Sequence, residues 1–409
     1  MIQKNIELLV PASNLEVLKV AVKYGADAVY IGGEMYGLRA KAKNFSKEDM
    51  IEGIDYCHKN GVKIFITANI MARNDDLEGV KEYLKELNEM KPDAVIIGDP
   101  GVFVMAKEIL QDIDIHISTQ ANNTNYATFN FWKNLGASRV VAARELSLKE
   151  IEEIRDNIPE DMEIEAFMHG AMCMSFSGRC LLSNYFTGKD ANKGECTHPC
   201  RWKYSVVEET RPGEYMPVYE NERGTYIFNS KDLCMIEHIP EMLNAGINSF
   251  KIEGRMKTAL YVATVARTYR QAINDYLESP EKYLSKLEYY KKEIGKCTYR
   301  EFTTGFFFGN PDKAQIYDSN TYVTNYVYLG MVNSCKDGII EVEQRNKFSV
   351  GEEVEVMKVN GDNLKLTVKA IYDEDMQSMD SCPHPKQKLY VDLGIELEEL
   401  DILRRKGNR

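Results

Sequence analysis

The sequence predicts a TIM-like (β/α)8 barrel followed by a small all-β barrel domain. Short β-branched runs alternate with helix-period segments through most of the first 280 residues, and repeating βα units imply a parallel sheet. Beyond about residue 318 the pattern changes to short alternating strands separated by glycine turns. Within the first region, the stretch from Cys173 to about Ile227 is rich in Gly, Ser, Asn and Thr and lacks periodicity. We expect that stretch to be a long insertion after the seventh barrel strand.

Eight predicted strands build the barrel. They lie at Glu7–Val10, Ala28–Ile31, Lys63–Thr67, Ala94–Ile97, Ile113–Ile117, Arg139–Val141, Glu163–Phe167 and Ser249–Ile252. Between them, apolar residues recur three and four apart, the signature of amphipathic helices, over 14–24, 47–59 and 76–87, and again over 258–277 after the last strand. An open doubly wound sheet would show the same alternation. The sequence has no Gly-x-Gly-x-x-Gly after the first strand and no Walker loop, so the barrel is favoured.

Three regions follow from these patterns. Residues 1–279 form the barrel and include the insertion at 173–234, and residues 280–318, dense in Lys, Glu and Tyr, form a helical linker. Residues 319–409 form the small β-barrel domain. Its strands are predicted at 321–323, 326–330, 339–342, 353–356, 365–368 and 388–391.

Charge and composition limit the kinds of partner. The net charge of −12 argues against a nonspecific polyanion binder. Arg179, Lys193, Arg201 and Lys203 leave a local basic site open, although ordinary surface charges would have the same spacing. No apolar run approaches the ~18 residues of a membrane span, and the N-terminus has no secretory signal pattern. We therefore expect a cytoplasmic protein whose thiols stay reduced.

Five of the nine cysteines fall within the insertion. Their order is Cys173-x6-Cys180-x15-Cys196-x3-Cys200, with Cys234 farther on. Four thiolates can hold zinc or an iron–sulfur cluster, and clustered cysteines in a reducing compartment are more often metal ligands than disulfides. The chemical alternative is one nucleophilic cysteine with His169 or His198 as its base, but that chemistry requires a single thiol rather than a group. The other four cysteines suit buried, independent positions.

Polar residues at the ends of the predicted strands mark a second candidate site, because active sites of βα barrels lie at those ends. We take Glu165, His169, Glu253 and Gln120 as candidate catalytic residues. Arg39, Arg144, Lys251 and Arg255 are candidates for binding an anionic small molecule, since guanidinium groups bind carboxylates bidentately. Asn69, Asp99, Asn122 and Glu145 also end strands. For any single position, a helix cap or a surface salt bridge is the competing explanation.

The stretch from Glu165 to Ser183 resembles the signature of peptidase family U-32, the collagenase-like proteases. Further agreement covers essentially the whole chain, at Glu7–Asn14, Gly25–Gly32, Cys196–Trp202, Asn229–Cys234 and Phe250–Arg255. The family name implies proteolysis. Its better-understood members, however, are RNA and ubiquinone hydroxylation proteins that bind a 4Fe-4S cluster and depend on prephenate, a dicarboxylate. The sequence is most similar to the branch that makes 5-hydroxyuridine at the tRNA wobble position.

The resemblance implies a cluster held by Cys173, Cys180 and Cys196, with Cys200 as the fourth ligand and Cys234 in reserve. It implies tRNA and prephenate as partners, with the β domain as a contact surface for folded RNA. Because that domain has more acids than bases, a basic groove must be local or shared with a partner subunit, so homo- and hetero-oligomers stay open. The alternatives are a peptidase and an accessory subunit that carries the cluster for a hydroxylation complex.

Overall fold

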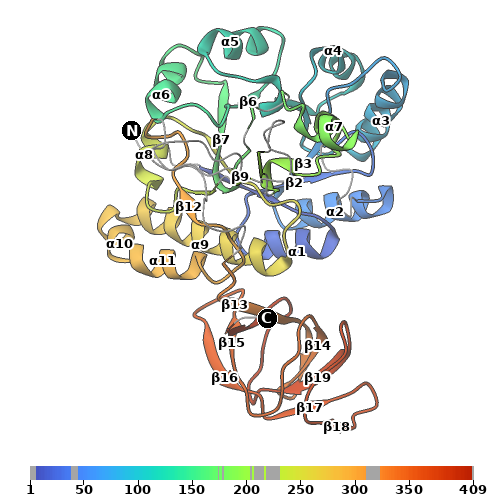
Figure 1. The fold of residues 1–409 in the computed structure, drawn as a ribbon, viewed down its shortest axis with the longest axis vertical. Coiled ribbons are helices and arrows are strands. Elements are labelled where there is room, and N and C mark those ends of the chain that lie inside the picture. The colour runs from blue at the N-terminus through green and yellow to red at the C-terminus, as the bar shows by residue number, and fades with distance from the viewer. Residues whose placement is uncertain are drawn as a thin grey trace.

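The structure is a computed structural model that describes residues 6–37, 45–173, 175–176, 179–202, 205–206, 216–217, 231–309 and 323–407. It contains a barrel ringed by helices and a smaller β domain attached to one side of it (Figure 1). The predicted fold class is therefore confirmed. In the described part of the chain, no helix is both long enough and apolar enough to cross a membrane.

Eight parallel strands close the barrel in the order β11-β1-β2-β3-β4-β5-β6-β7, and β11 pairs with β7 to complete the ring. The strands are β1 Glu7–Pro11, β2 Ala28–Gly32, β3 Lys63–Ala68, β4 Ala94–Ile97, β5 Asp114–Ile117, β6 Arg139–Val141, β7 Glu163–Ala171 and β11 Ser249–Ile252. Every one of them overlaps a predicted strand. Their outer faces pack on the helices in one continuous hydrophobic core, and their inner faces enclose a second, small cluster around Tyr30, Phe65 and Ile96.

Helices follow the strands and cover the outside of the barrel (Figure 1). They are α1 Leu15–Lys23, α2 Lys47–Lys59, α3 Leu77–Met90, α4 Pro100–Ile109, α5 Tyr126–Asn134, α6 Leu148–Asp156, α8 Ile239–Asn244 and α9 Ala259–Glu278. Side-chain caps fix several of their starts: Asn14 accepts from the N–H of Val17, and Ser147 forms a capping box with Glu150. Asp99 caps α4 in the same way, so the helix-cap explanation holds for this residue.

The insertion and its surroundings contain short elements that periodicity does not predict. They are α7 Leu182–Thr187, the 3-10 turns η2 Ala191–Lys193 and η3 Pro199–Arg201, the hairpin of β8 Ser205–Val206 with β9 Met216–Pro217, and β10 Asp232–Cys234. Strand β10 runs antiparallel to the last residues of β7, which places Cys234 opposite His169. Strand β12, Phe302–Thr303, pairs in parallel with β10. Elements of two or three residues are too short to show a period.

The linker begins as predicted with helices α10 Pro280–Ser285 and α11 Leu287–Ile294, which pack beside α9. The part of the linker at 310–318 lies outside the described residues. Of the strand predicted at 321–323, the structure describes only Val323, which forms an isolated bridge to Tyr299. Within the described residues, the predicted strand thus corresponds to a single β-bridge.

The second domain is one antiparallel sheet that curls into a half-barrel around its own core. Its strands, in the order β16-β15-β20-β13-β14-β19-β17-β18, are β13 Tyr326–Lys336, β14 Ile339–Gln344, β15 Glu353–Met357, β16 Leu364–Thr367, β17 Ala370–Tyr372, β18 Ser378–Met379, β19 Lys388–Asp392 and β20 Ile402–Lys406. Among described residues β16 does not pair with β18, so the sheet stays open. The short strands β17 and β18 were not predicted, and neither was β20. The sequence of β20, Ile-Leu-Arg-Arg-Lys, does not alternate between apolar and polar residues. The reason is that a charged residue, Arg404, occupies a buried position at the contact with the barrel.

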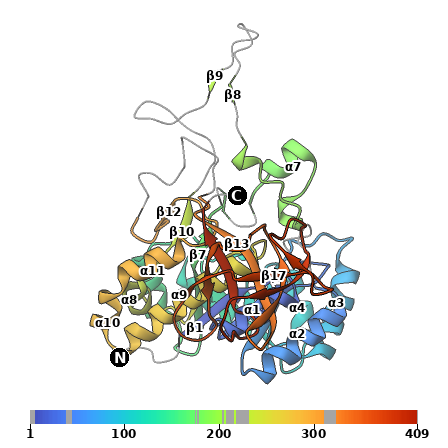
Figure 2. The ribbon, with the colours of Figure 1, turned by 90° about the horizontal axis from the view of Figure 1, so that it is seen from below.

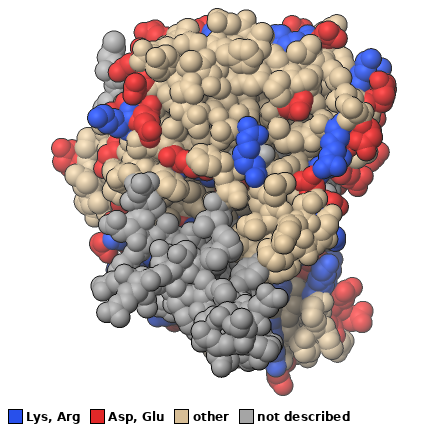
Figure 3. Space-filling model, turned by 45° about the horizontal axis from the view of Figure 1, so that its top comes forward, with Lys and Arg blue, Asp and Glu red and all other residues tan. Residues whose placement is uncertain are grey.

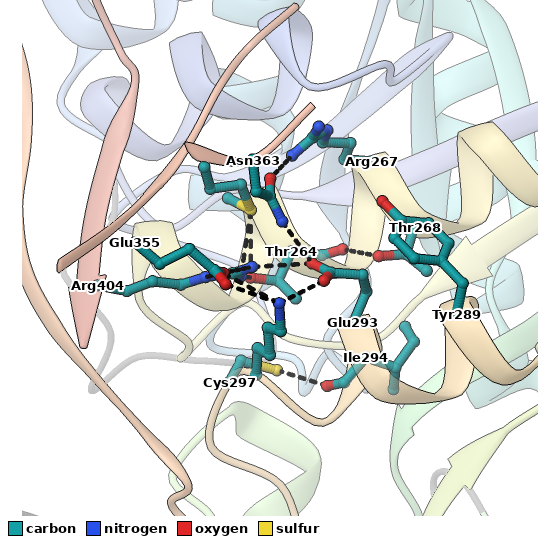
Figure 4. A network of polar contacts seen from close by, with 12 residues as sticks. Thr264, Arg267, Thr268, Tyr289, Glu293, Ile294, Cys297, Glu355, Asn363 and Arg404 are labelled. Carbon is teal, nitrogen blue, oxygen red and sulfur yellow. Dashed lines mark hydrogen bonds and ion pairs between the residues drawn. The ribbon is translucent and has the colours of Figure 1, made fainter. Parts of the chain in front are cut away.

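A buried polar network joins the half-barrel to the helices of the barrel (Figure 4). Arg404 is fully buried and contacts Glu293 of α11 at 2.8 Å and Glu355 of β15 at 2.5 Å. Lys296 contacts the same two carboxylates. At another point of the contact between the two domains, the hydroxyl of Tyr24, directly after α1, donates to two backbone carbonyls of the half-barrel. The two domains are therefore held in one orientation by contacts that are largely shielded from water.

Arg404→Met is expected to lower the free energy of unfolding by about 3 kcal/mol, the lower end for a broken buried ion pair, because Lys296 still contacts both carboxylates. The matched control is the neighbouring Arg405→Met. Arg405 pairs with the partly exposed Glu352, so its loss should cost less than about 1 kcal/mol. Urea unfolding of both variants measures the difference, and equal midpoints would contradict the expectation.

The same network predicts a pH dependence. Burial alone would raise the pKa of Glu293, but Arg404 and Lys296 outweigh it and hold the pKa below 4.5. A carboxylate with a lowered folded pKa stabilises the protein above its unfolded pKa, and this contribution is lost as the pH falls through the folded value. The stability difference between the natural protein and Arg404→Met should therefore shrink below pH 4.5.

Candidate functional site at the barrel mouth

A cavity of about 190 Å³ lies at the C-terminal ends of the barrel strands, beneath the cysteine-rich insertion. The barrel contributes Asn69, Gln120, Arg144, Lys251, Glu253 and Arg255 to its wall. The insertion contributes Cys173, Cys180, Cys196, His198 and Cys200. The two sites predicted separately from the sequence, the strand ends and the cysteine group, are thus two walls of one cavity.

Arg144 and Glu253 form an ion pair in the cavity wall. The guanidinium of Arg144 lies 4.0 Å from the centre of the Phe167 ring, a cation–π contact that holds its plane. Its Nη2 is 3.5 Å from Oε2 of Glu253, while its buried Nε has no hydrogen-bond partner. Gly170 permits the approach of Glu253, because a Cβ at this position would lie 2.2 Å from the Glu253 carbonyl oxygen. Arg144 therefore has donor capacity left for a ligand.

Lys251 connects the cavity to a chain of charges inside the barrel. Its Nζ is 2.6 Å from Oε1 of Glu165 and 4.5 Å from the ring centre of Tyr30. Glu165 is fully buried and its other oxygen is 3.3 Å from Arg139. Arg139 pairs in turn with Glu7 and Glu163 near the N-terminal ends of the strands. Lys251 lines the cavity, whereas Glu165 lies below it and fixes the position of the lysine.

Arg255 completes the cationic side of the cavity. Its Nη1 donates to Oγ1 of Thr67, at the end of β3, over 3.0 Å. Its guanidinium lies against Gly32, where a Cβ would come within 2.3 Å of Nη2. Only glycine leaves this space, so the end of β2 is shaped around the arginine.

The charged side chains of the cavity wall are therefore mostly cationic. Among the described lining residues, Arg144, Lys251 and Arg255 are cations and Glu253 alone is an acid. Neutral hydrogen-bonding groups fill the neighbouring wall, where Asn69 donates to the hydroxyl of Ser118 over 3.2 Å beside Gln120. Such a wall is suited to an anionic small molecule that also offers hydrogen-bonding groups.

The cysteines of the insertion surround the other side of the cavity. Cys173, Cys180 and Cys196 are free thiols, and Cys200 lines the wall with them. Their donor chemistry fits a soft metal or an iron–sulfur cluster. Among the residues that the structure describes, however, no three Cys, His, Asp or Glu side chains are close enough together to hold a metal ion. The thiols share one cavity wall without forming a preassembled set.

Cys234 and His169 lie behind the cavity wall, on paired positions of β10 and β7. Both contact the hydroxyl of Tyr269, at 3.7 Å from the thiol and 3.2 Å from Nδ1. Burial lowers the pKa of His169 to about 3, and burial raises the pKa of the Cys234 thiol to about 11. This environment favours a neutral thiol and a neutral imidazole, the opposite of what an activated cysteine nucleophile needs.

The structure thus sorts the predicted site residues by place. Gln120, Arg144, Lys251, Glu253 and Arg255 meet at the cavity together with the four cysteines of the insertion. Glu165 and His169 do not line it, and Arg39 lies outside the described residues. Asn122 and Glu145 are also absent from the lining.

Sequence reasoning missed Tyr30, Thr67, Phe167 and Asn192, which also line the cavity. His198, one of the two histidines considered as a base, lies on the cavity wall with a left-handed backbone, φ 56°. Tyr30, Thr67 and Phe167 lie within predicted strands, where the inward-facing alternation was the available signal. Asn192 and His198 had no such signal, because the insertion has no period.

Comparisons with known proteins agree with this architecture. The family pattern of Peptidase family U32 matches residues 13–317, and that of the Peptidase family U32 C-terminal domain matches residues 324–404. A protein of Bacillus subtilis named tRNA hydroxylation protein P1 is 40% identical over 99% of this chain and 96% of its own length. An uncharacterized protease of Methanocaldococcus jannaschii is 41% identical over 85% of this chain and 86% of its own.

A more distant relative is the 23S rRNA 5-hydroxycytidine synthase of Escherichia coli. It is 31% identical over 89% of this chain, which corresponds to 53% of the relative. Both the barrel and the half-barrel are thus matched by family patterns, and together these cover nearly all of the described residues. The chain belongs to peptidase family U32.

Proposed function

We propose that this protein is an RNA hydroxylation enzyme that forms 5-hydroxyuridine at the wobble position of tRNA, with a 4Fe-4S cluster and prephenate as cofactor and cosubstrate. The observation that carries the proposal is the single cavity with cysteines on one wall and three cations on the other. Similarity over nearly the full length to a tRNA hydroxylation protein, and to a synthase of a 5-hydroxylated pyrimidine, supports the same reaction class. The proposal places the protein in the cytoplasm, where tRNA is available.

The residues that line the cavity are assigned different roles according to their chemistry. Cys173, Cys180, Cys196 and Cys200 would hold the cluster, which supplies redox chemistry when bound. Arg144, Lys251 and Arg255 bind and orient the two carboxylates of prephenate. Glu253 is the acidic group at the cavity and is the candidate for proton transfer there, with Gln120 as a neutral hydrogen-bonding neighbour.

Nucleoside mass spectrometry of tRNA tests the proposed function directly. A deletion strain should lack 5-hydroxyuridine and its further-modified derivatives, and a plasmid copy of the gene should restore them. Purified protein with tRNA, prephenate and a reductant then separates an enzyme from an accessory subunit. Restoration in cells without product in the purified reaction would identify a missing partner, and unchanged nucleosides in the deletion strain would contradict the proposal.

The family name and the archaeal relative keep a peptidase as the second candidate. A thiol peptidase needs a cysteine activated by a histidine, and the pair Cys234 and His169 has the wrong protonation tendencies for this role. His198 lies on the same wall as the cysteines and is the histidine that such a mechanism would use. A peptidase assay with His198→Ala and a single Cys→Ala variant decides between the two.

Arg144→Met should weaken prephenate binding by about 10- to 150-fold, because hydrogen bonds to a charged group contribute about 1.5–3 kcal/mol. Its stacked guanidinium has a buried Nε that lacks a partner within the protein. Isothermal titration calorimetry with prephenate measures the change, and Arg405→Met, which alters an arginine of the half-barrel, serves as the control. Equal affinities of the two variants would remove Arg144 from the binding site.

A further inference from the structure

A group of exposed aromatic side chains occupies the insertion. Tyr185 is 82% exposed, Phe176 48%, Phe186 46% and Trp202 45%, and Leu181 beside them is 74% exposed. The rings form a series: Tyr185 and Phe186 are 5.3 Å apart in a T-shaped contact, and Phe186 and Trp202 are 6.4 Å apart. Soluble proteins seldom expose several large apolar side chains together unless the surface binds something. We call these five residues the aromatic rim.

The aromatic rim borders the cavity. Phe176 belongs both to the rim and to the cavity wall, and Leu182 at the start of α7 lines the cavity, while Tyr185 and Phe186 of the same helix are exposed. Figure 2 shows α7 standing out from the end of the barrel, away from the helices that surround the strands. The rim therefore adjoins the cavity, within reach of a large substrate whose reacting group enters it.

Contacts with the barrel hold this part of the insertion in place. Lys193 is 2.8 Å from Asp76 at the start of α3, and Asp190 is 3.0 Å from Arg73. The N–H of Met71 donates to the carbonyl of Asn192 over 3.1 Å. The segment that directly follows α7 is thus anchored to the loop after β3, and anchoring near a binding surface lowers the entropic cost of using it.

Charge indicates the class of partner. Residues 173–203 contain five basic and two acidic residues, whereas the rest of the chain contains 46 basic and 61 acidic ones. Of these basic residues, Arg179 and Lys189 are exposed, and in the sequence they lie within three residues of Phe176 and Phe186 respectively. On the face shown in Figure 3, the described surface has wide uncharged areas between separate charged side chains. Exposed rings with a local positive surplus in an acidic protein match the way unpaired nucleic-acid bases are bound.

We propose that the aromatic rim is a stacking surface for the unpaired bases that flank the target base of the substrate RNA. Stacking on aromatic rings tolerates any base, so it would hold a single-stranded loop while the cavity selects the base that reacts. Arg179 and Lys189 would contact the neighbouring phosphates. This inference rests on the proposed function, because it assumes that RNA is the substrate.

Fluorescence anisotropy with a labelled RNA hairpin that carries an unpaired uridine loop tests the inference. Tyr185→Ala and Phe186→Ala are each expected to weaken binding by about five- to 150-fold, the range for loss of one stacked base. Phe131→Ala is the matched control, because Phe131 is 52% exposed on α5 outside the rim. Tyr185→Phe should bind like the natural protein, since the ring is retained. Binding to a fully paired duplex should not respond to Tyr185→Ala.

Salt dependence separates the two kinds of contact. Tyr185→Ala should leave the slope of log Kd against log salt unchanged, while Lys189→Ala should reduce it by about 0.7 for one lost phosphate contact on a single strand. Iron content and unfolding midpoint, measured on every variant, exclude an effect through the cluster or through folding.

The outcomes distinguish this inference from the proposed function. If the natural protein hydroxylates tRNA and binds the hairpin, but the rim variants bind it equally well, the stacking surface is wrong and the function stands. If the natural protein neither binds the hairpin nor modifies tRNA, the proposed function fails. If Tyr185→Ala instead changes the molar mass in light scattering, the rim contacts a protein or a second copy, and the inference is overturned.

Discussion

Cys180→Ala is expected to yield a protein with little iron and no detectable formation of 5-hydroxyuridine. A 4Fe-4S cluster is held by four ligands, commonly all cysteine thiolates, and Cys180 is one of four thiol residues on a single cavity wall. Anaerobically purified natural protein should be brown, with about four iron atoms per chain. Cys335→Ala is the matched control, because Cys335 lies on β13 of the half-barrel. A colourless natural protein with full activity would contradict the cluster.

The same measurement identifies the fourth ligand. Cys200 lines the cavity with Cys173, Cys180 and Cys196, whereas the thiol of Cys234 contacts Tyr269 behind the wall. This placement predicts that Cys200→Ala loses iron and that Cys234→Ala retains it. The reverse result would move the fourth ligand to β10 and show that the thiols converge toward the end of β7 when the cluster binds.

The barrel could be predicted from the sequence because its signal is periodic and repeated. The eight strands, from Glu7–Pro11 to Ser249–Ile252, are short apolar runs, and all but β7, which leads into the insertion, are followed by a helical segment. The repetition makes the prediction of each single strand more secure. Strand β20 shows the limit of this reasoning. The burial of Arg404 depends on Glu293, 111 residues earlier in the chain, and no local pattern contains such a partner.

The candidate site was predictable in part for a related reason. Strand ends can be located once the strands are known, so Arg144, Lys251 and Arg255 were found by position. Position did not show which of these polar groups faces the cavity. Glu165 and Lys251 both lie within predicted strands, but only the packing of the barrel interior puts the ammonium of Lys251 in the cavity wall and leaves the carboxylate of Glu165 outside it. The rings of the aromatic rim gave no periodic signal, because exposure in an irregular insertion depends on tertiary structure.

Glu165→Gln is expected to lower the free energy of unfolding by about 3–5 kcal/mol, because it leaves the buried ammonium of Lys251 without its counter-charge. Arg139, the second partner of Glu165, still contacts Glu7 and Glu163, so the loss falls mainly on Lys251. Urea unfolding at neutral pH measures it. Glu145→Gln is the control, and we expect it to leave the free energy of unfolding nearly unchanged. Burial raises the pKa of Glu145, and a neutral side chain therefore suits that position and should cost little.

A double-mutant cycle shows whether the cost comes from the unpaired charge. Lys251→Met alone removes the cation and leaves Glu165 with Arg139, and the double variant removes the pair together. The double variant should be less destabilised than the sum of the two single changes by about 0.5–3 kcal/mol, the usual coupling of side chains in contact. Additive losses would mean that the two residues act independently. In that case Glu165 would not be the group that positions Lys251 in the cavity wall. A direct role of Glu165 in the reaction would then need its own activity measurement.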